Sequence, residues 1–255
     1  MHRYFLEVAY NGTAYSGFQS QHNANSIQAE IEKAIEIIQK QKCSMTGSSR
    51  TDAGVHACQN FFHFDAVFPI IQWEKIDNEF QLVYKLNAIL PADIVIKSIK
   101  EVKKEGHCRF DAISREYKYY IYQQKNPFLQ GIAYFFPYNL DLEKMQQASA
   151  LIKEHTDFTS FCKRKTQVKS FICCIEESNW HIKDDTLIYT VRSNRFLRGM
   201  VRALTATMLK IGRGTISLDE FKAIIEAKNC TKASFAVPAQ GLFLTKVNYP
   251  DKLFL

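Results

Sequence analysis

Gly47-Ser48-Ser49-Arg50-Thr51-Asp52-Ala53-Gly54-Val55-His56 is the most informative stretch of the chain. Glycines at both ends permit tight turns and a close approach of the backbone to its neighbours. Between them lie one cation, Arg50, and one carboxylate, Asp52. The apolar run that follows, over 61–64, predicts a strand, and loops held beside rigid strands often carry chemistry. On composition alone, however, an ordinary surface turn is the favoured interpretation.

The bulk composition excludes several classes of protein. The 255 residues are enough for one large domain or two modest ones. No apolar run approaches the length of about 20 residues that a membrane-spanning helix needs, and the N-terminus lacks the hydrophobic region of a signal peptide. The seven cysteines include no Cys-x-x-Cys, which argues against a disulfide scaffold and against a zinc site. We therefore expect a reduced, cytoplasmic protein that is not attached to a membrane.

The charge permits a phosphate-rich partner without requiring one. The net charge is +7, from 33 Lys and Arg against 26 Asp and Glu. A positive net charge is common in nucleic-acid-binding proteins, but many basic proteins bind no nucleic acid.

The predicted elements follow one order in each half of the chain: strand, helix, strands, helix, strand. The hydrophobic patterns predict strands at 4–10, 61–64, 94–102, 117–122, 170–180, 186–193 and 241–249. They predict helices that begin at Ser26 and that span 78–89, 142–152, 196–211, capped by Gly212, and 217–227. The charged segment 100–106 separates two domains, 1–104 and 105–255. Each is an α+β unit with a mostly antiparallel sheet and helices on one side.

A second group of charged residues opens the helix predicted over 196–211. Arg198 and Arg202 are four residues apart and so are expected to share a helical face, which a solvated surface explains simply. Arg202, however, follows Val201 in the apolar part of the helix, and a buried unpaired charge is very costly. It therefore needs a carboxylate partner from elsewhere in the fold, and Asp52 is the candidate.

Aromatic and imidazole side chains add one further candidate. Tyr117 opens a tyrosine-rich strand and is either an aromatic core residue or a ring that stacks on a nucleic-acid base. His56 and His63 follow Asp52 closely but show no metal-ligand pattern.

Together these features resemble the tRNA pseudouridine synthase A family. The opening stretch is similar to the Arg-Thr-Asp-x-Gly-Val-His signature of that family. The similarity continues, in order and over nearly the whole chain, through Tyr10-Asn11-Gly12-Thr13-x-Tyr15-x-Gly17-Phe18-Gln19-x-Gln21, Ser26-Ile27-Gln28, Leu86-Asn87-x-x-Leu90-Pro91-x-Asp93-Ile94, Arg109-Phe110-Asp111-Ala112, Arg115-x-Tyr117-x-Tyr119, His155-x-Asp157-Phe158, Phe196-Leu197-x-x-Met200-Val201-Arg202 and Pro238-Ala239-x-Gly241-Leu242.

The resemblance implies an α+β fold of two ferredoxin/RRM-like halves, whose mostly antiparallel sheets join across a central active-site cleft. It implies an isomerase that flips uridine out of the tRNA anticodon stem-loop, at positions 38, 39 and 40, and converts it to pseudouridine. By position, Asp52 matches the nucleophile, and Arg202 matches the arginine that pairs with it. Tyr117 matches the tyrosine that stacks on the base and helps to move its proton, and Arg50 matches an arginine that assists base flipping.

The resemblance also implies no cofactor, no catalytic metal, and a homodimer that binds tRNA with both subunits. Phosphate contacts are expected from a set of basic residues, for each of which a solvated surface role is an equal alternative: Lys163, Arg164, Lys165, Arg195 and Arg198. The chain departs from the family pattern at several positions, among them the helix interior Ala203-Leu204-Thr205-Ala206, where a glycine is common. Phe18 stands where tryptophan is usual, Ser49 replaces a smaller residue, and Cys108 follows His107 where the family usually has alanine.

Two other functions compete with this hypothesis. A non-catalytic RNA-binding protein of the same fold would keep the basic residues and Tyr117, but would not need Asp52 together with Arg202. A metal-dependent phosphodiesterase could use Asp52, but it would need a second carboxylate close by, and the stretch around Asp52 offers none.

Overall fold

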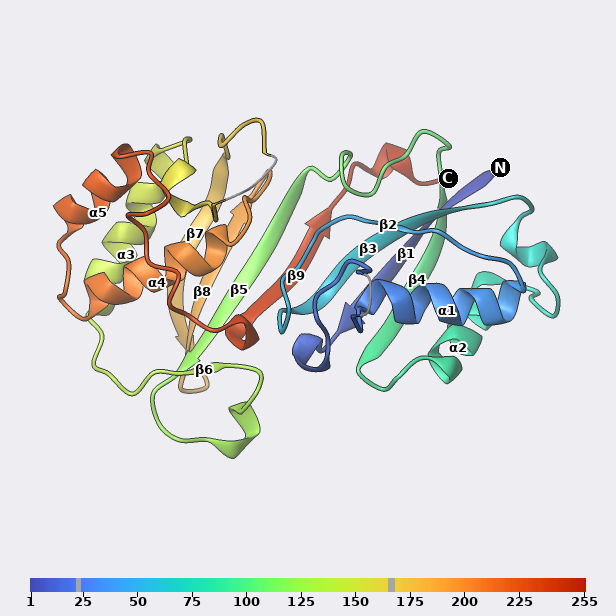
Figure 1. Ribbon diagram of the computed structural model, residues 1–255, viewed down its shortest axis with the longest axis horizontal. Helices are drawn as coiled ribbons and strands as arrows, with labels where there is room; N and C mark the ends of the chain where they lie inside the picture. The colour runs from blue at the N-terminus through green and yellow to red at the C-terminus, as the bar shows by residue number, and fades with distance from the viewer. Residues whose placement is uncertain (22–23, 165–167) are drawn as a thin grey trace. The chain divides into compact units, whose positions relative to one another are not determined.

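The computed structural model describes residues 1–21, 24–164 and 168–255. It has a mixed α/β structure in which open sheets are mostly antiparallel (Figure 1). The described residues form two compact units, Met1–Ile113 with Leu244–Leu255, and Ser114–Phe243. These units differ from the predicted domains 1–104 and 105–255 in that the C-terminal residues belong to the first unit. Within the described residues, no helix is long and apolar enough to cross a membrane.

The first unit is built on a sheet with the strand order β4-β1-β3-β9. The central strand β1 (His2–Tyr10) pairs antiparallel with both β3 (His56–Ala66) and β4 (Ile94–Val102). The strand β9 (Leu242–Asn248) follows β3 in the sheet, and the short β2 (Thr46–Gly47) also pairs with β3. This arrangement confirms the predicted strands and extends the one expected at 61–64.

Two helices cover one face of this sheet, α1 (Ile27–Gln39) and α2 (Glu79–Ile89) (Figure 1). Both begin at a residue whose side chain accepts a backbone hydrogen bond, as N-cap residues do. Ser26 accepts from the N–H of Ala29, and Asn78 accepts from the N–H of Gln81. The apolar residues of the first helix, Ile27, Ile31, Ala34 and Ile35, are the buried ones. Both helix predictions are confirmed.

The second unit has a sheet with the order β5-β8-β7, and β6 (Tyr134–Phe135) adds to β5 in parallel. β5 (Ser114–Tyr122) and β7 (Ile175–Lys183) both pair antiparallel with β8 (Thr186–Ser193). The strands predicted at 170–180 and 186–193 form a hairpin that turns at Asp184 and Asp185, whose φ angles of 49° and 56° are typical of a two-residue type I′ turn. The hairpin is confirmed, although its first strand begins at Ile175 and not at 170.

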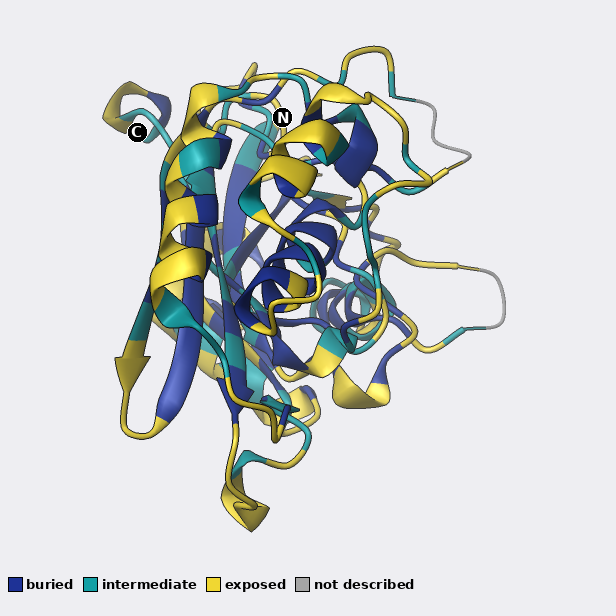
Figure 2. Cartoon of the chain, turned by 90° about the vertical axis from the view of Figure 1, so that its left-hand side faces the viewer, coloured by how far each residue is buried: buried dark blue, intermediate teal, exposed yellow. Residues whose placement is uncertain are grey.

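Three helices pack in the second unit: α3 (Leu142–Leu151), α4 (Met200–Gly212) and α5 (Leu218–Glu226). Helix α4 is buried along almost its whole length (Figure 2), as expected of a helix that is apolar on all sides. The start of α5 is a capping box, in which Ser217 and Glu220 exchange side-chain hydrogen bonds with each other's backbone.

Two predictions about α4 are wrong. The helix begins at Met200, not at 196, because Gly199 before it has a left-handed φ of 74°. Arg198 therefore lies outside the helix and does not share a helical face with Arg202. At the other end, Gly212 is the last helical residue, where a side chain would collide with Met145. The left-handed glycine that follows the helix is Gly214, with φ of 69°.

Candidate active site

The stretch that carries Asp52 connects β2 to β3 in the first unit. A tight turn follows Asp52, because the N–H of Val55 donates to the Asp52 carbonyl at 3.2 Å and Gly54 has a φ of 75°. The side chain of Asp52 is half-buried, whereas that of Arg50 is exposed. The two charged residues thus differ in their access to solvent.

A buried hydrogen-bond network holds the loop on either side of Arg50. The hydroxyl of Tyr10 lies 2.8 Å from Thr51 Oγ1 and accepts a hydrogen bond of 3.2 Å from Asn60 Nδ2. The hydroxyl of Ser48 donates to Asn60 Oδ1 at 2.6 Å. Asn60 is 0% exposed and Ser48 is 1% exposed. Because buried polar groups are stable only when paired, this network fixes the position of the backbone from Ser48 to Thr51.

The loop after β1 packs against the Asp52 stretch so closely that it needs glycine. A Cβ atom on Gly12 would overlap the carbonyl oxygen of Val55. The N–H of Gly12 donates to Nδ1 of the buried His56 at 3.1 Å. Gly17 has a φ of 119°, and a Cβ there would lie 3.2 Å from the carbonyl oxygen of Thr51. The backbone on both sides of Asp52 is therefore clamped from the N-terminal loop.

Phe18 completes this clamp. Its N–H donates to the Thr51 carbonyl at 3.2 Å, and its ring stacks on Phe62 with a centroid distance of 4.4 Å. The ring also occupies the space that a side chain at Gly47 would need. Phe18, which stands where the family usually has tryptophan, is 1% exposed and fills a packing role under the loop.

Tyr117 and Arg202 lie in the second unit. Tyr117 is on β5, is 9% exposed, and meets Phe196 edge-to-face with ring centroids 5.0 Å apart. Arg202 is on α4 and half-buried, and its Nε and Nη2 both donate to the carbonyl of Val237, at 3.1 and 2.7 Å. This double hydrogen bond fixes the guanidinium against the segment before β9.

Tyr119 links these two residues. It lies two positions after Tyr117 on β5 and so points to the same face. Its hydroxyl donates to the carbonyl of Pro238 at 2.7 Å, next to the carbonyl that Arg202 binds. Burial raises the pKa of Tyr119, and the nearby charge of Arg202 opposes this rise. Tyr117, Tyr119 and Arg202 thus form one side-chain cluster of the second unit.

The basic residues predicted to bind phosphate differ in exposure. Arg164 and Arg198 are exposed, whereas Lys163 and Arg195 are half-buried. The N–H of Lys163 donates to the carbonyl of Arg198 at 2.9 Å, so the structure brings these two residues together. Lys165, which was also predicted, lies outside the described residues.

The sequence indicated the charged residues of the site but not the residues that hold them in place. It did not predict the roles of Asn60, Phe196 and the Val237 carbonyl, although Phe196 lies within one of the quoted motifs. A weak signal existed for Asn60, since it is a polar residue directly before the apolar strand predicted at 61–64. The pairing of Arg202 with Asp52 stays a prediction, because the two residues belong to different units.

The ligand geometry does not favour a metal site at Asp52. Among the residues that the structure describes, the clusters of three or more His, Cys, Asp or Glu side chains do not include Asp52. A hydrolase that uses a divalent metal ordinarily gathers several oxygen or nitrogen ligands.

Comparison with known proteins identifies the family. A family model described as tRNA pseudouridine synthase matches residues 7–111 and 154–250. The chain belongs to this family. Proteins named tRNA pseudouridine synthase A from Azobacteroides pseudotrichonymphae and Parabacteroides distasonis are 42% and 43% identical to it. These matches cover 100% of this chain and 99% and 98% of the relatives. A protein of the same name from Staphylococcus aureus is 37% identical over 96% of this chain and 91% of its own length.

The contact between Gly12 and Val55 gives a prediction for this member of the family. Gly12→Ala should lower the free energy of unfolding by about 2–3 kcal/mol, because the added methyl group forces a rigid backbone contact apart. Urea unfolding measures the loss. Gly131→Ala is the control: it has φ of 82° but nothing within 4 Å of its Cβ position, so it should cost only about 1 kcal/mol of backbone strain. Equal stability of Gly12→Ala and the wild type would contradict the close packing.

Proposed function

We propose that this protein converts uridine to pseudouridine in tRNA, with Asp52 as the nucleophile. The observation that carries the proposal is the position of Asp52: it lies in the Arg-Thr-Asp-x-Gly-Val-His motif, on a loop fixed by buried hydrogen bonds, in a chain that belongs to the tRNA pseudouridine synthase family. A half-buried carboxylate on a rigid loop is suited to attack a substrate that is brought to it.

The finer details of the substrate rest on the family resemblance. We propose that the target uridines are at tRNA positions 38, 39 and 40 in the anticodon stem-loop. A uridine in a stem must leave the base stack before a side chain can reach it, which is the step assigned to Arg50. The exposed guanidinium of Arg50, beside an anchored backbone, supports this role.

Tyr117 is proposed to stack on the flipped base and to help move its proton. Its ring is held edge-on by Phe196, so its orientation is set before a substrate arrives. Base–aromatic stacking is worth about 1–3 kcal/mol per base, which is enough to keep a detached uracil from leaving while it turns. The reaction adds and removes no group, so the proposal needs no cofactor.

Arg202 is proposed to pair with Asp52 and to keep its carboxylate ionised, since a nearby cation favours the charged form of an acid. The double hydrogen bond to Val237 supports the proposal because it fixes the orientation of the guanidinium. Two ferredoxin-like halves with a central cleft, a homodimer and a cytoplasmic location complete the proposal, and all three rest on the resemblance.

A tRNA assay tests the central claim. Asp52→Asn and Asp52→Ala should abolish pseudouridine formation in unmodified tRNA, because neither side chain can act as a carboxylate nucleophile. Pseudouridine is mapped after incubation with chelator, and the matched control is Asp77→Asn, an exposed carboxylate of the same unit. Strand cleavage in place of isomerisation, or full activity of Asp52→Asn, would show that the proposal is wrong.

The pairing of Arg202 with Asp52 has its own test. Arg202→Ala should cost about 1–3 kcal/mol of stability, partly because it leaves the Val237 carbonyl unpaired. A double-mutant cycle with Asp52→Ala separates the two effects: if the pair exists, the two losses should be less than additive by about 0.5–3 kcal/mol. Urea unfolding of the four proteins gives the coupling. Strict additivity would rule the pair out.

The basic residues predict the salt dependence of tRNA binding. Affinity should fall linearly on a double-logarithmic plot against salt, because phosphate contacts release counterions. Arg164→Ala and Arg198→Ala should each reduce the slope by about 1 if the residue contacts a phosphate. Lys222→Ala, an exposed lysine on α5, is the control. A slope that no arginine variant changes would assign these residues to the solvated surface.

A further inference from the structure

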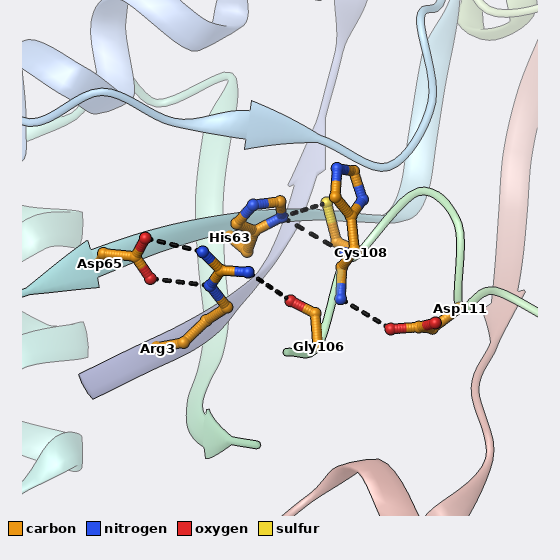
Figure 3. A network of polar contacts seen from close by, with 7 residues as sticks. Arg3, His63, Asp65, Gly106, Cys108 and Asp111 are labelled. Atoms are coloured by element: carbon orange, nitrogen blue, oxygen red, sulfur yellow. Dashed lines mark hydrogen bonds and ion pairs between the residues drawn. The ribbon is translucent and has the colours of Figure 1, made fainter. Parts of the chain in front are cut away.

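His63, His107 and Cys108 lie together in the first unit. His63 is on β3, and the other two residues lie in the connection between β4 and β5. One ligand atom from each lies within 4.8 Å of the other two. Over the described residues, this is the one group of three His, Cys, Asp or Glu side chains gathered so closely. Figure 3 shows His63 and Cys108 facing each other across this cluster.

We propose that His63, His107 and Cys108 bind one zinc ion, with a water molecule as the fourth ligand. Imidazole nitrogen and thiolate sulfur are the donor set that zinc prefers, and three protein ligands with one open position is a common zinc geometry. Zinc binding would displace the proton of the Cys108 thiol to solvent, since the thiolate is the ligand.

Backbone hydrogen bonds hold both imidazole rings close to Cys108. Nδ1 of His63 lies 3.1 Å from Sγ of Cys108 and accepts the N–H of Cys108 at 3.3 Å, so its lone pair faces this residue. Nδ1 of His107 accepts the N–H of Arg109 at 3.1 Å, so Nε2 carries the ring proton, and zinc would bind this ring only after the hydrogen bond from Arg109 is released. A metal-binding imidazole usually donates its second N–H to an acceptor, so both rings would exchange a backbone hydrogen bond for the bond to zinc.

The distances are close to those of a zinc site. With bond lengths of about 2.0–2.1 Å to nitrogen and about 2.3 Å to sulfur, a tetrahedral ion places these atoms about 3.6 Å apart. The separation of 3.1 Å between His63 Nδ1 and Cys108 Sγ needs to widen by only about half an ångström. His107 is half-exposed, so water can reach the fourth position, while Cys108 and His63 are 0% and 7% exposed.

Hydrogen bonds and an ion pair around the cluster hold the ligands. Asp111 accepts the N–H of His107 at 2.7 Å, which fixes the turn that presents both His107 and Cys108. Arg3 forms a two-point ion pair of 2.7 Å with Asp65 and donates to the carbonyl of Gly106 at 3.0 Å (Figure 3).

The ion would fasten the connection between β4 and β5 to the sheet. Without the ion, Cys108 contacts β2 and β3 through hydrogen bonds. The thiol donates one of them to the Thr46 carbonyl at 3.0 Å. A metal that binds only the folded state shifts unfolding toward higher temperature as its concentration rises. The role assigned to zinc is therefore structural and independent of the proposed reaction.

Spectroscopy of the full-length, metal-free, reduced protein tests the site. Addition of cobalt(II) should produce a thiolate-to-cobalt charge-transfer band and visible bands of a tetrahedral ion at one equivalent, and zinc should abolish them. Cys108→Ala should lose the charge-transfer band and bind zinc on the order of 100-fold more weakly. Cys43→Ala is the matched control, because Cys43 is a buried cysteine of the same unit outside the cluster.

Thermal unfolding supplies the second readout. Zinc should raise the unfolding temperature of the wild type and of Cys43→Ala, but not that of Cys108→Ala. His107→Ala removes a half-exposed ligand and should fold normally, so it tests the site even if Cys108→Ala is unstable. The absence of a thiolate–cobalt band in the wild type, or an equal zinc shift in the His107 variant, would overturn the proposal. These readouts do not involve tRNA, so they are distinct from a failure of the proposed activity.

Discussion

The carbonyl oxygen of Val55 occupies the space that a side chain at residue 12 would need, and the geometry around Asp52 depends on this contact. Because Gly12 lets the two backbones touch, its N–H reaches His56, and the loop after β1 can lie under the Asp52 turn. Gly17 and Phe18 extend the same contact to Thr51. A loop of small and polar residues would otherwise have few buried contacts and would move freely. Its rigidity comes from a neighbouring loop and not from its own sequence.

A buried hydrogen-bond network beneath the loop also fixes the position of its backbone. Ser48, Thr51, Tyr10 and Asn60 are all buried, and hydrogen bonds join Ser48 to Asn60, Asn60 to Tyr10, and Tyr10 to Thr51. Such networks are stable only when every member is satisfied, so they specify one arrangement of the backbone. Arg50, between Ser48 and Thr51, can then be exposed on an anchored main chain. In the second unit, hydrogen bonds likewise hold Arg202, in this case to the main-chain carbonyl of Val237.

Periodicity and capping residues were sufficient to predict most helices and strands, because these signals are local. The apolar spacing of α1 and the capping box of α5 are read directly from neighbouring residues. The start of α4 was mispredicted because residues 196–199 continue the apolar pattern, while the left-handed Gly199 stops the helix. The spacing of apolar residues does not predict the backbone angle of a single glycine. The motif residues of the site could be identified from resemblance, but their supports, Asn60 and Val237, depend on contacts between distant segments.

The cluster of His63, His107 and Cys108 shows why such contacts escape a linear reading. His63 precedes His107 and Cys108 by more than forty residues, and the pairing of β3 with β2, which sets Thr46 opposite His63, helps to bring the three side chains together. The absence of a Cys-x-x-Cys pair argued against zinc in the sequence. A site made of two imidazoles and one thiol contains no such pair, so the cysteine spacing does not reveal it. Cys108 occupies a position at which the family usually has alanine, so the family pattern does not reveal it either. Three-dimensional proximity is therefore the one property that distinguishes these residues from an ordinary buried thiol and two structural histidines.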